Sequence, residues 1–166
     1  MQADRPDGSQ GAVAALMAAS RAFVGITARS LAALDADVTL PQFRTLVVLA
    51  MRGPQRPADI SAELNVAPST GTRMCERLVR KGLVRRAGTP NDRRVVRLRL
   101  TPAGESLVDE VISRRRDELA AIVDATAEHW QPAVTAALHA FARAAGEVPE
   151  QEWWLGWADD SGEVAV

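Results

Sequence analysis

Hydrophobic and polar residues alternate with the period of an α-helix at both ends of this chain. From residue 11 to about residue 35, apolar positions recur every three or four residues, which predicts one long amphipathic helix. A second long helix is expected to begin after Thr101, and a third to cover about residues 128–145. Residues 1–10 are polar and contain proline and glycine, so they are expected to be disordered.

The middle of the chain has the pattern of three shorter helices. They are expected at residues 40–52, 58–64 and 68–81. Thr39 and Gln42 have the spacing of a capping box at the start of the first. Pro57 and Pro68 suit the opening turns of the other two, because a helix tolerates proline there. Gly82 is expected to end the third.

A two-residue period replaces the helical one after Gly82. From residue 96 to residue 100, apolar and basic residues alternate, which predicts a strand with one buried face. Residues 83–86 and a polar tip at 87–92 complete a predicted β-hairpin. The expected fold class is therefore mainly α with a small β-hairpin wing: a winged helix-turn-helix lobe plus long N- and C-terminal helices.

Charge is distributed unevenly along the chain. The window from Arg73 to Arg99 has nine Arg and one Lys against two acidic residues, a net charge of +8, while the remainder carries −9. Such a chain presents one cationic face to a polyanion. Two short helices joined by a turn, the second with outward Arg and hydroxyl residues, have the geometry of a helix-turn-helix that enters the major groove of DNA.

The candidate DNA contacts follow from this geometry. Arg73 is the candidate for reading guanine, and Arg93 at the hairpin tip is expected to enter the minor groove while Asp92 braces Arg94. The other candidates on the recognition helix are Ser69, Thr70, Thr72, Arg77 and Arg80, and those on the hairpin are Arg85, Arg86, Arg97 and Arg99. The alternative is a solvated basic surface, with the hairpin only covering the core.

Five short motifs carry a resemblance to a known family. They are LPQFR at 40–44, APSTGTR at 67–73, KGLV at 81–84, NDRR at 91–94 and LTPAG at 100–104. In combination they resemble the MarR-type winged-helix transcriptional regulators, over about residues 38–107. The resemblance implies a homodimer whose two wings straddle a pseudo-palindromic operator. It also implies repression relieved by a small-molecule effector, often an aromatic acid, or by oxidation.

Two residues depart from the pattern of that family. Ala67 stands where a Ser N-cap is common, so the recognition helix is expected to lack a side-chain cap worth about 1 kcal/mol. Gly71 stands where a branched apolar residue is usual. It is expected to loosen the recognition helix by up to about 1 kcal/mol relative to Ala.

The terminal helices also indicate a dimer on physical grounds, because their apolar stripes are too wide for the small central lobe to cover. Burial against a second copy of the chain would give the two-fold symmetry that a palindromic site requires. The expected organisation is a disordered N-terminus (1–10), a dimerisation helix (11–36), the DNA-binding lobe (38–101), two dimerisation helices (102–146) and an acidic tail (147–166). The tail's Trp153, Trp154 and Trp157 are expected to pack across the dimerisation helices, to cover the effector cleft or to dock another protein.

The cysteine content and the lengths of the apolar runs limit the classes of protein to which the chain can belong. A single cysteine, Cys75, excludes an internal disulfide and is expected to be a small buried hydrophobic residue, and the protein is expected in the cytoplasm. No apolar run is expected to approach the roughly 20 residues that cross a bilayer, so no membrane partner is expected.

No catalytic constellation is found, and His129 and His139 are too few for a zinc site, so no enzyme, metal or cofactor is expected besides an effector. The alternative function is a winged-helix module that binds protein instead of an operator, which the Trp-rich acidic tail would favour.

Overall fold

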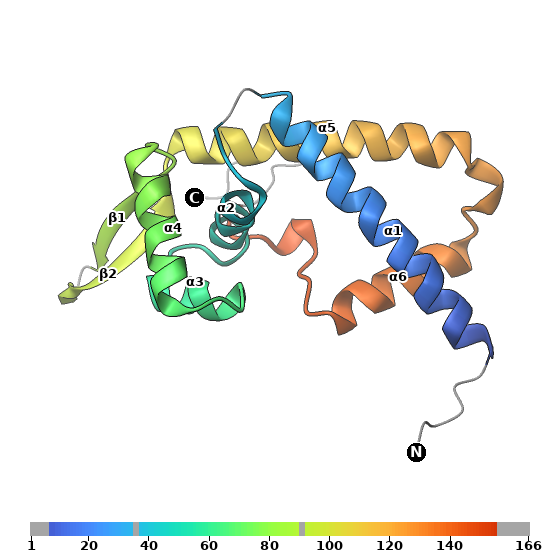
Figure 1. Cartoon of the computed structure of the whole chain (residues 1–166), viewed down its shortest axis with the longest axis horizontal. Coiled ribbons are helices and arrows are strands. Elements are labelled where there is room, and N and C mark those ends of the chain that lie inside the picture. The colour runs from blue at the N-terminus through green and yellow to red at the C-terminus, as the bar shows by residue number, and fades with distance from the viewer. Residues whose placement is uncertain (1–6, 35–36, 90–91, 156–166) are drawn as a thin grey trace, which may run out of the picture.

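The computed structural model describes residues 7–34, 37–89 and 92–155, and Figure 1 shows how its elements are arranged. The long helix α1 (Asp7–Ala32) precedes three shorter ones, α2 (Leu40–Arg52), α3 (Pro57–Glu63) and α4 (Pro68–Arg80). Next come the strands β1 (Val84–Thr89) and β2 (Asp92–Leu100), the long α5 (Pro102–Ala125), the short 3₁₀ helix η1 (Ala127–His129), α6 (Pro132–Ala144) and a second 3₁₀ helix, η2 (Glu150–Glu152). The predicted fold class, mainly helical with a hairpin wing, is confirmed.

Helix α2 lies at the centre of the hydrophobic core. All of its residues from 45 to 51 are buried, and Leu46 and Ala50 are completely inaccessible. The same core cluster includes Ile60 of α3, Leu78 of α4, Leu98 of β2, and Val108 and Val111 of α5. The predicted capping box starts α2, because Gln42 N–H donates to Thr39 Oγ1 at 3.4 Å and Thr39 N–H donates to Gln42 Oε1 at 3.1 Å.

The hairpin is fastened to the core at its base. β1 and β2 pair antiparallel from Val84 opposite Leu100 outwards. Leu98 exchanges two backbone hydrogen bonds, of 2.7 and 3.0 Å, with Gln55 in the turn before α3. Leu98 is buried as the alternating pattern predicts, but Val96 is 43% exposed because the hairpin extends beyond the core.

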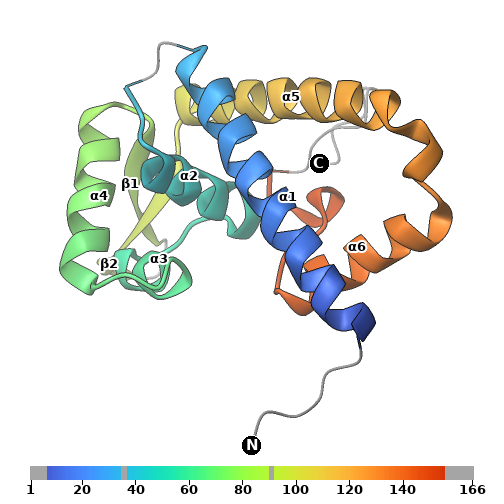
Figure 2. The same cartoon turned by 45° about the vertical axis from the view of Figure 1, so that its right-hand side comes forward.

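The three remaining helices extend away from this lobe. α1 crosses α5, and an ion pair between Arg29 and Glu118 joins the two. α6 has no buried residue, and both views place it at the end of the molecule away from the hairpin (Figures 1 and 2). The chain by itself therefore leaves most of α6 without a packing partner among the described residues.

Two helix boundaries differ from the prediction. α1 begins at Asp7, so the expectation of disorder through residue 10 is wrong for residues 7–10; the alanine-rich sequence that follows favours helix, and a helix once formed extends residue by residue. The last helix begins at Pro132 instead of residue 128. A residue before proline disfavours the helical region, and Gln131 is extended with ψ 155.

Helix α1 also corrects the expectation about apolar runs. Residues Ser9–Ala32 are long and apolar enough to cross a membrane, as judged by length and composition alone, and only 6% of the 18-residue apolar window within them is buried. Alanine makes up much of this stretch, and it raises the mean hydropathy without the bulky side chains that are typical of a membrane helix. The same exposed apolar face is what a helix shared between two subunits would present.

The segment after α6 returns to the lobe instead of only crossing the long helices. We call residues 147–155 the C-terminal strap. Trp154 N–H donates to Met51 O at 3.0 Å, and Leu155 N–H donates to Ala50 O at 3.3 Å, so the strap lies against the end of α2. Trp153 is partly buried against the core cluster, whereas Trp154 is 62% exposed. The strap also reaches α5, because Glu150 pairs with Arg116 at 2.8 Å. The expectation that the tail packs across the dimerisation helices therefore stays a prediction, and Trp157 lies outside the described residues.

Candidate nucleic-acid interface

Helix α4 has one polar exposed face and one buried face. Gly71, Met74, Cys75 and Leu78 are buried on its inner side. The predicted contact residues are all exposed: Ser69, Thr70, Thr72, Arg73, Arg77 and Arg80. Helical periodicity therefore placed this side of α4 correctly. Its outer surface offers three guanidinium groups and three hydroxyl groups along one helix, which suits contacts to base edges and phosphates.

The start of α4 has no side-chain N-cap. Ala67 makes no side-chain cap, as expected from its sequence, and Pro68 occupies the first turn. Thr72 Oγ1 donates to Pro68 O at 2.8 Å. The hydroxyl proton of Thr72 is therefore used within the helix, and only its oxygen lone pairs are free to accept a bond from a base amino group.

Gly71 has a packing role that the sequence did not reveal. A Cβ at this position would overlap Ser61 Oγ and would lie 2.9 Å from Ser61 Cβ. Ser61 is 2% exposed and donates to Pro57 O at 2.8 Å, so its side chain is already engaged in α3. The expectation that Gly71 merely loosens the helix is therefore incomplete. Glycine here lets α3 and α4 approach closely, which fixes the angle of the helix-turn-helix.

The arginines of the hairpin fall into three groups. Arg85, Arg86 and Arg99 are exposed along the strands. Arg97 is half-buried and donates from a terminal nitrogen to Pro54 O at 3.1 Å, so it ties the hairpin to the turn after α2. Asp92, Arg93 and Arg94 belong to β2, but their side chains lie outside the described residues, and the brace between Asp92 and Arg94 stays a prediction.

Cys75 lies on the buried side of α4, as predicted. It is 3% exposed, and burial is the main cause that raises the pKa of its thiol. A buried thiol with a raised pKa is a poor nucleophile at neutral pH, because the thiolate is the reactive form. This environment favours a packing role for Cys75 over redox sensing.

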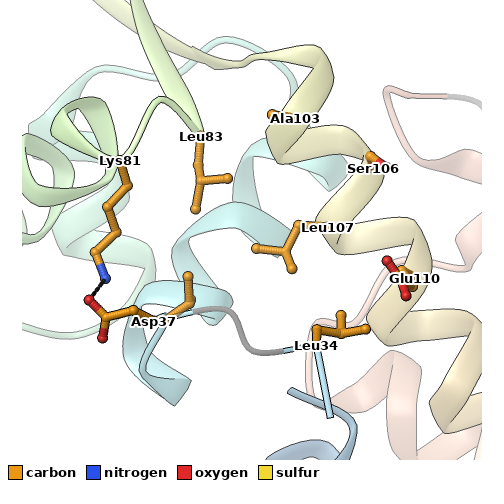
Figure 3. A pocket seen from close by; sticks show the side chains of 9 residues that line it. Leu34, Asp37, Lys81, Leu83, Ala103, Ser106, Leu107 and Glu110 are labelled. Carbon is orange, nitrogen blue, oxygen red and sulfur yellow. Dashed lines mark hydrogen bonds and ion pairs between the residues drawn. The ribbon is translucent and has the colours of Figure 1, made fainter. Parts of the chain in front are cut away.

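A cavity of about 510 Å³ lies where the lobe meets the long helices (Figure 3). Leu34, Leu83 and Leu107 point into it from α1's end, the hairpin and α5. Lys81, the residue after α4, donates to Asp37 at 3.0 Å on its rim. The cavity therefore lies between the end of the recognition helix and the long helices, and Lys81 and Asp37 on its rim are paired with each other.

A second cavity, of about 280 Å³, lies between α1, α2 and α5 and was not found from the sequence. Its apolar walls include Phe23, Phe43 and Val47. Its charged residues are Arg44 and Arg115, which come from helices far apart in the chain. Burial lowers the pKa of Arg115, and its Nε is buried without a hydrogen-bond partner among the described residues. An aromatic and apolar pocket with two guanidinium groups suits an aromatic carboxylate.

The fold and this exposed basic helix define a winged helix-turn-helix protein, and comparisons with known proteins place it more closely. The MarR family model matches residues 38–96. The RV1404 structure from Mycobacterium tuberculosis is 39% identical, with a TM-score of 0.75, over 87% of this chain and 99% of that one. The chain belongs to the MarR family.

Two curated relatives from Bacillus subtilis match the central part of the chain. The uncharacterized HTH-type transcriptional regulator YsmB is 39% identical over 82 residues, which is 49% of this chain and 56% of that protein. The HTH-type transcriptional repressor MdtR is 35% identical over 79 residues, 48% of this chain and 51% of that protein. The chain thus spans about half the length of these relatives.

Proposed function

We propose that this protein is a cytoplasmic transcriptional regulator that binds a pseudo-palindromic operator as a homodimer. The observation that carries the proposal is the exposed face of α4, where Arg73, Arg77 and Arg80 stand beside three hydroxyl residues. The basic strands of the hairpin continue this face, and membership of the MarR family supports the same reading. Repression is supported by the relative MdtR, which is named as a repressor.

The homodimer is supported by apolar side chains that a single chain leaves in water. Val13, Met17 and Val24 of α1 are 50–58% exposed, and Phe141 of α6 is 53% exposed. Large apolar surfaces of this kind are costly unless a partner covers them. A second copy of the chain would cover them symmetrically, and the symmetry would match a palindromic operator.

A small aromatic acid is the proposed effector, with the cavity between α1, α2 and α5 as its site. Phe23 and Phe43 would contact the ring, and Arg115 would pair with the carboxylate. The unpartnered Nε of Arg115 supports this assignment, because a buried donor without an acceptor is costly. The ligand would touch α2 and the long helices together, so its binding would change how the lobe is held.

Operator binding is expected to depend steeply on salt. Each phosphate that the protein neutralises contributes about −0.9 to the slope of log affinity against log salt concentration. With several arginines on each of two subunits, we expect a slope of about −5 or steeper. Fluorescence anisotropy with DNA from upstream of the protein's own gene measures it. A slope close to zero would contradict the phosphate contacts.

Arg73→Ala is expected to reduce sequence preference. Loss of a guanine contact costs about 1–3 kcal/mol on the operator and less on unrelated DNA, whereas loss of Arg93 at the hairpin tip should weaken binding to both more evenly. Competition binding with operator and scrambled duplexes measures the ratio. Arg114→Ala, which removes an exposed charge from α5, is the matched control and is expected to keep wild-type preference. Equal preference in Arg73→Ala and wild type would refute the proposed contact.

The second candidate function is a winged-helix module that binds another protein. The exposed indole of Trp154 favours it, because a large aromatic side chain on a surface is a common interface anchor. A mobility-shift experiment separates the two functions. Retarded upstream DNA supports the regulator, and the absence of retardation at low salt supports the protein-binding module.

A further inference from the structure

The C-terminal strap is attached to the lobe at the end of α2. The last carbonyl groups of a helix have no partner within it, and two of them, at Ala50 and Met51, accept the strap's backbone N–H groups. Trp153 Nε1 donates to Val148 O at 3.0 Å, which folds the strap onto itself. Gly53 follows α2 with φ 71, and a Cβ there would lie 2.6 Å from the Trp154 ring. The end of α2 is thus shaped to receive the strap.

The strap also brings carboxylates to a cluster of arginines. Glu147 accepts a hydrogen bond from Arg44 of α2 at 3.1 Å, and Glu150 accepts one from Arg116 of α5 at 2.8 Å. Arg115 interacts with members of both pairs: burial lowers its pKa, Glu150 raises it, Arg44 lowers it and Glu147 raises it. Arg115 lines the cavity between α1, α2 and α5. It also lines a third cavity, of about 400 Å³, whose lining includes Arg116 and Glu150.

We propose that Arg44, Arg115 and Arg116 form an anion site that the strap fills with its own carboxylates, and that a small aromatic carboxylate takes their place and frees the strap. The inference rests on the proposed effector function and names how that site is regulated. The strap acts as an internal competitor of the effector. An ion pair whose side chains are 43–65% exposed is weak, so an acid in the cavity can exchange with it.

Release of the strap would change how the recognition helix is held, because the strap contacts α2 and α2 leads directly into α3 and α4. The strap follows α6, one of the long helices, and its end holds α2, whose next turn leads into α3 and α4. While the strap is bound, it connects the lobe to the long helices in addition to the packing of α1 on α2, of α2 on α5 and of β2 on α5. Once it is free, the orientation of α4 is less restricted, and the two recognition helices of a dimer are no longer held at one spacing.

The double variant E147Q/E150Q tests the competition, because glutamine keeps the size of each side chain and removes its charge. With benzoate as the probe, its affinity is expected to rise about threefold to tenfold, since the competing pairs are gone. Benzamide, which has the same ring without the charge, is expected to bind both proteins equally. Isothermal titration on the full chain without DNA measures both ligands.

Hydrogen exchange tests the release. In wild type, benzoate is expected to increase the exchange rates of the Trp154 and Leu155 amides, and in E147Q/E150Q these rates should be raised already without ligand. Glu152→Gln is the matched control, because Glu152 is in the same strap but makes none of the ion pairs found among the described residues. It is expected to match wild type in both measurements.

Three results would overturn this inference. They are the absence of benzoate binding to either protein, equal benzoate affinity in E147Q/E150Q and wild type, and unchanged exchange at Trp154 and Leu155 when benzoate is bound. None of them bears on operator binding, which is measured without ligand. Absence of benzoate binding would overturn the proposed effector site together with the strap mechanism, whereas benzoate that binds with unchanged affinity or unchanged exchange would overturn the strap mechanism alone. Failure of the strap mechanism is therefore distinguishable from failure of the effector site and of DNA binding.

Discussion

Gly104→Ala is expected to lower the free energy of unfolding by about 3 kcal/mol, although alanine is the better helix former. A Cβ at this position would overlap Leu83 O, and would lie 3.1 Å from the carbonyl carbon and 3.2 Å from Leu100 Cδ2. The clash is with backbone, which no change of side-chain rotamer relieves. Chemical denaturation followed by circular dichroism measures the loss.

The reason lies in how the first turn of α5 meets the end of the recognition helix. Thr101 Oγ1 donates to Gly82 O at 2.6 Å and accepts from Gly104 N–H at 3.1 Å, while Thr101 N–H donates to Leu83 O. Because Gly104 has no Cβ, the first turn of α5 can pack directly on the backbone of Leu83. The LTPAG motif is thus explained by packing between α5 and the recognition lobe.

Gly11→Ala provides the control for Gly104→Ala. Gly11 is also helical, but its Cβ would meet no atom within 4 Å. Helix propensity alone then applies, and alanine is expected to stabilise α1 by up to about 1 kcal/mol. Wild-type stability in Gly104→Ala would show that the close approach of α5 to Leu83 is not present in solution.

Local signals were sufficient to predict much of this fold. The capping box of Thr39 and Gln42 and the stop at Gly82 depend on neighbours within four residues, so the sequence pattern identified them correctly. The exposed face of α4 followed from helical periodicity. The last helix begins later than its apolar pattern predicts, because Pro132 disfavours the helical region for Gln131.

Features that depend on long-range packing were missed or misjudged. Gly71 suggested a weak helix, but its value comes from contact with Ser61 on a different helix. Arg44 ends the LPQFR motif, but no sequence pattern connects it to Arg115, and only the folded chain brings the two to one cavity. Likewise, no local pattern shows that the strap's backbone binds the end of α2.

Long-range contacts hold the DNA-binding lobe in a fixed orientation relative to the long helices. Arg97, Gly104 and the strap each fix one side of the lobe: the hairpin, the start of α5 and the end of α2. A regulator with two-fold symmetry needs this rigidity, because a small rotation of each lobe changes the distance between two recognition helices. The proposed effector site, next to the strap and Arg115, is well placed to change that rotation.

Phe141→Asp is expected to dissociate the dimer and thereby abolish operator binding at nanomolar concentrations. Phe141 is 53% exposed on α6, which has no buried residue in the single chain. By symmetry the variant puts two unpaired carboxylates into an apolar interface, at a cost of about 3 kcal/mol or more, which is about a hundredfold in the dissociation constant. Sedimentation velocity measures the dimer.

Ala136→Asp introduces the same charge on the opposite side of α6 and is expected to remain dimeric with wild-type operator affinity. In Phe141→Asp, the dependence of residual DNA binding on salt should also change, because a monomer contacts one half-site and neutralises half as many phosphates. Its log–log slope is therefore expected to fall to about half of the wild-type value. A dimeric Phe141→Asp protein that binds the operator with an unchanged slope would place the subunit interface elsewhere, and the exposed apolar face of α6 would then need a different partner.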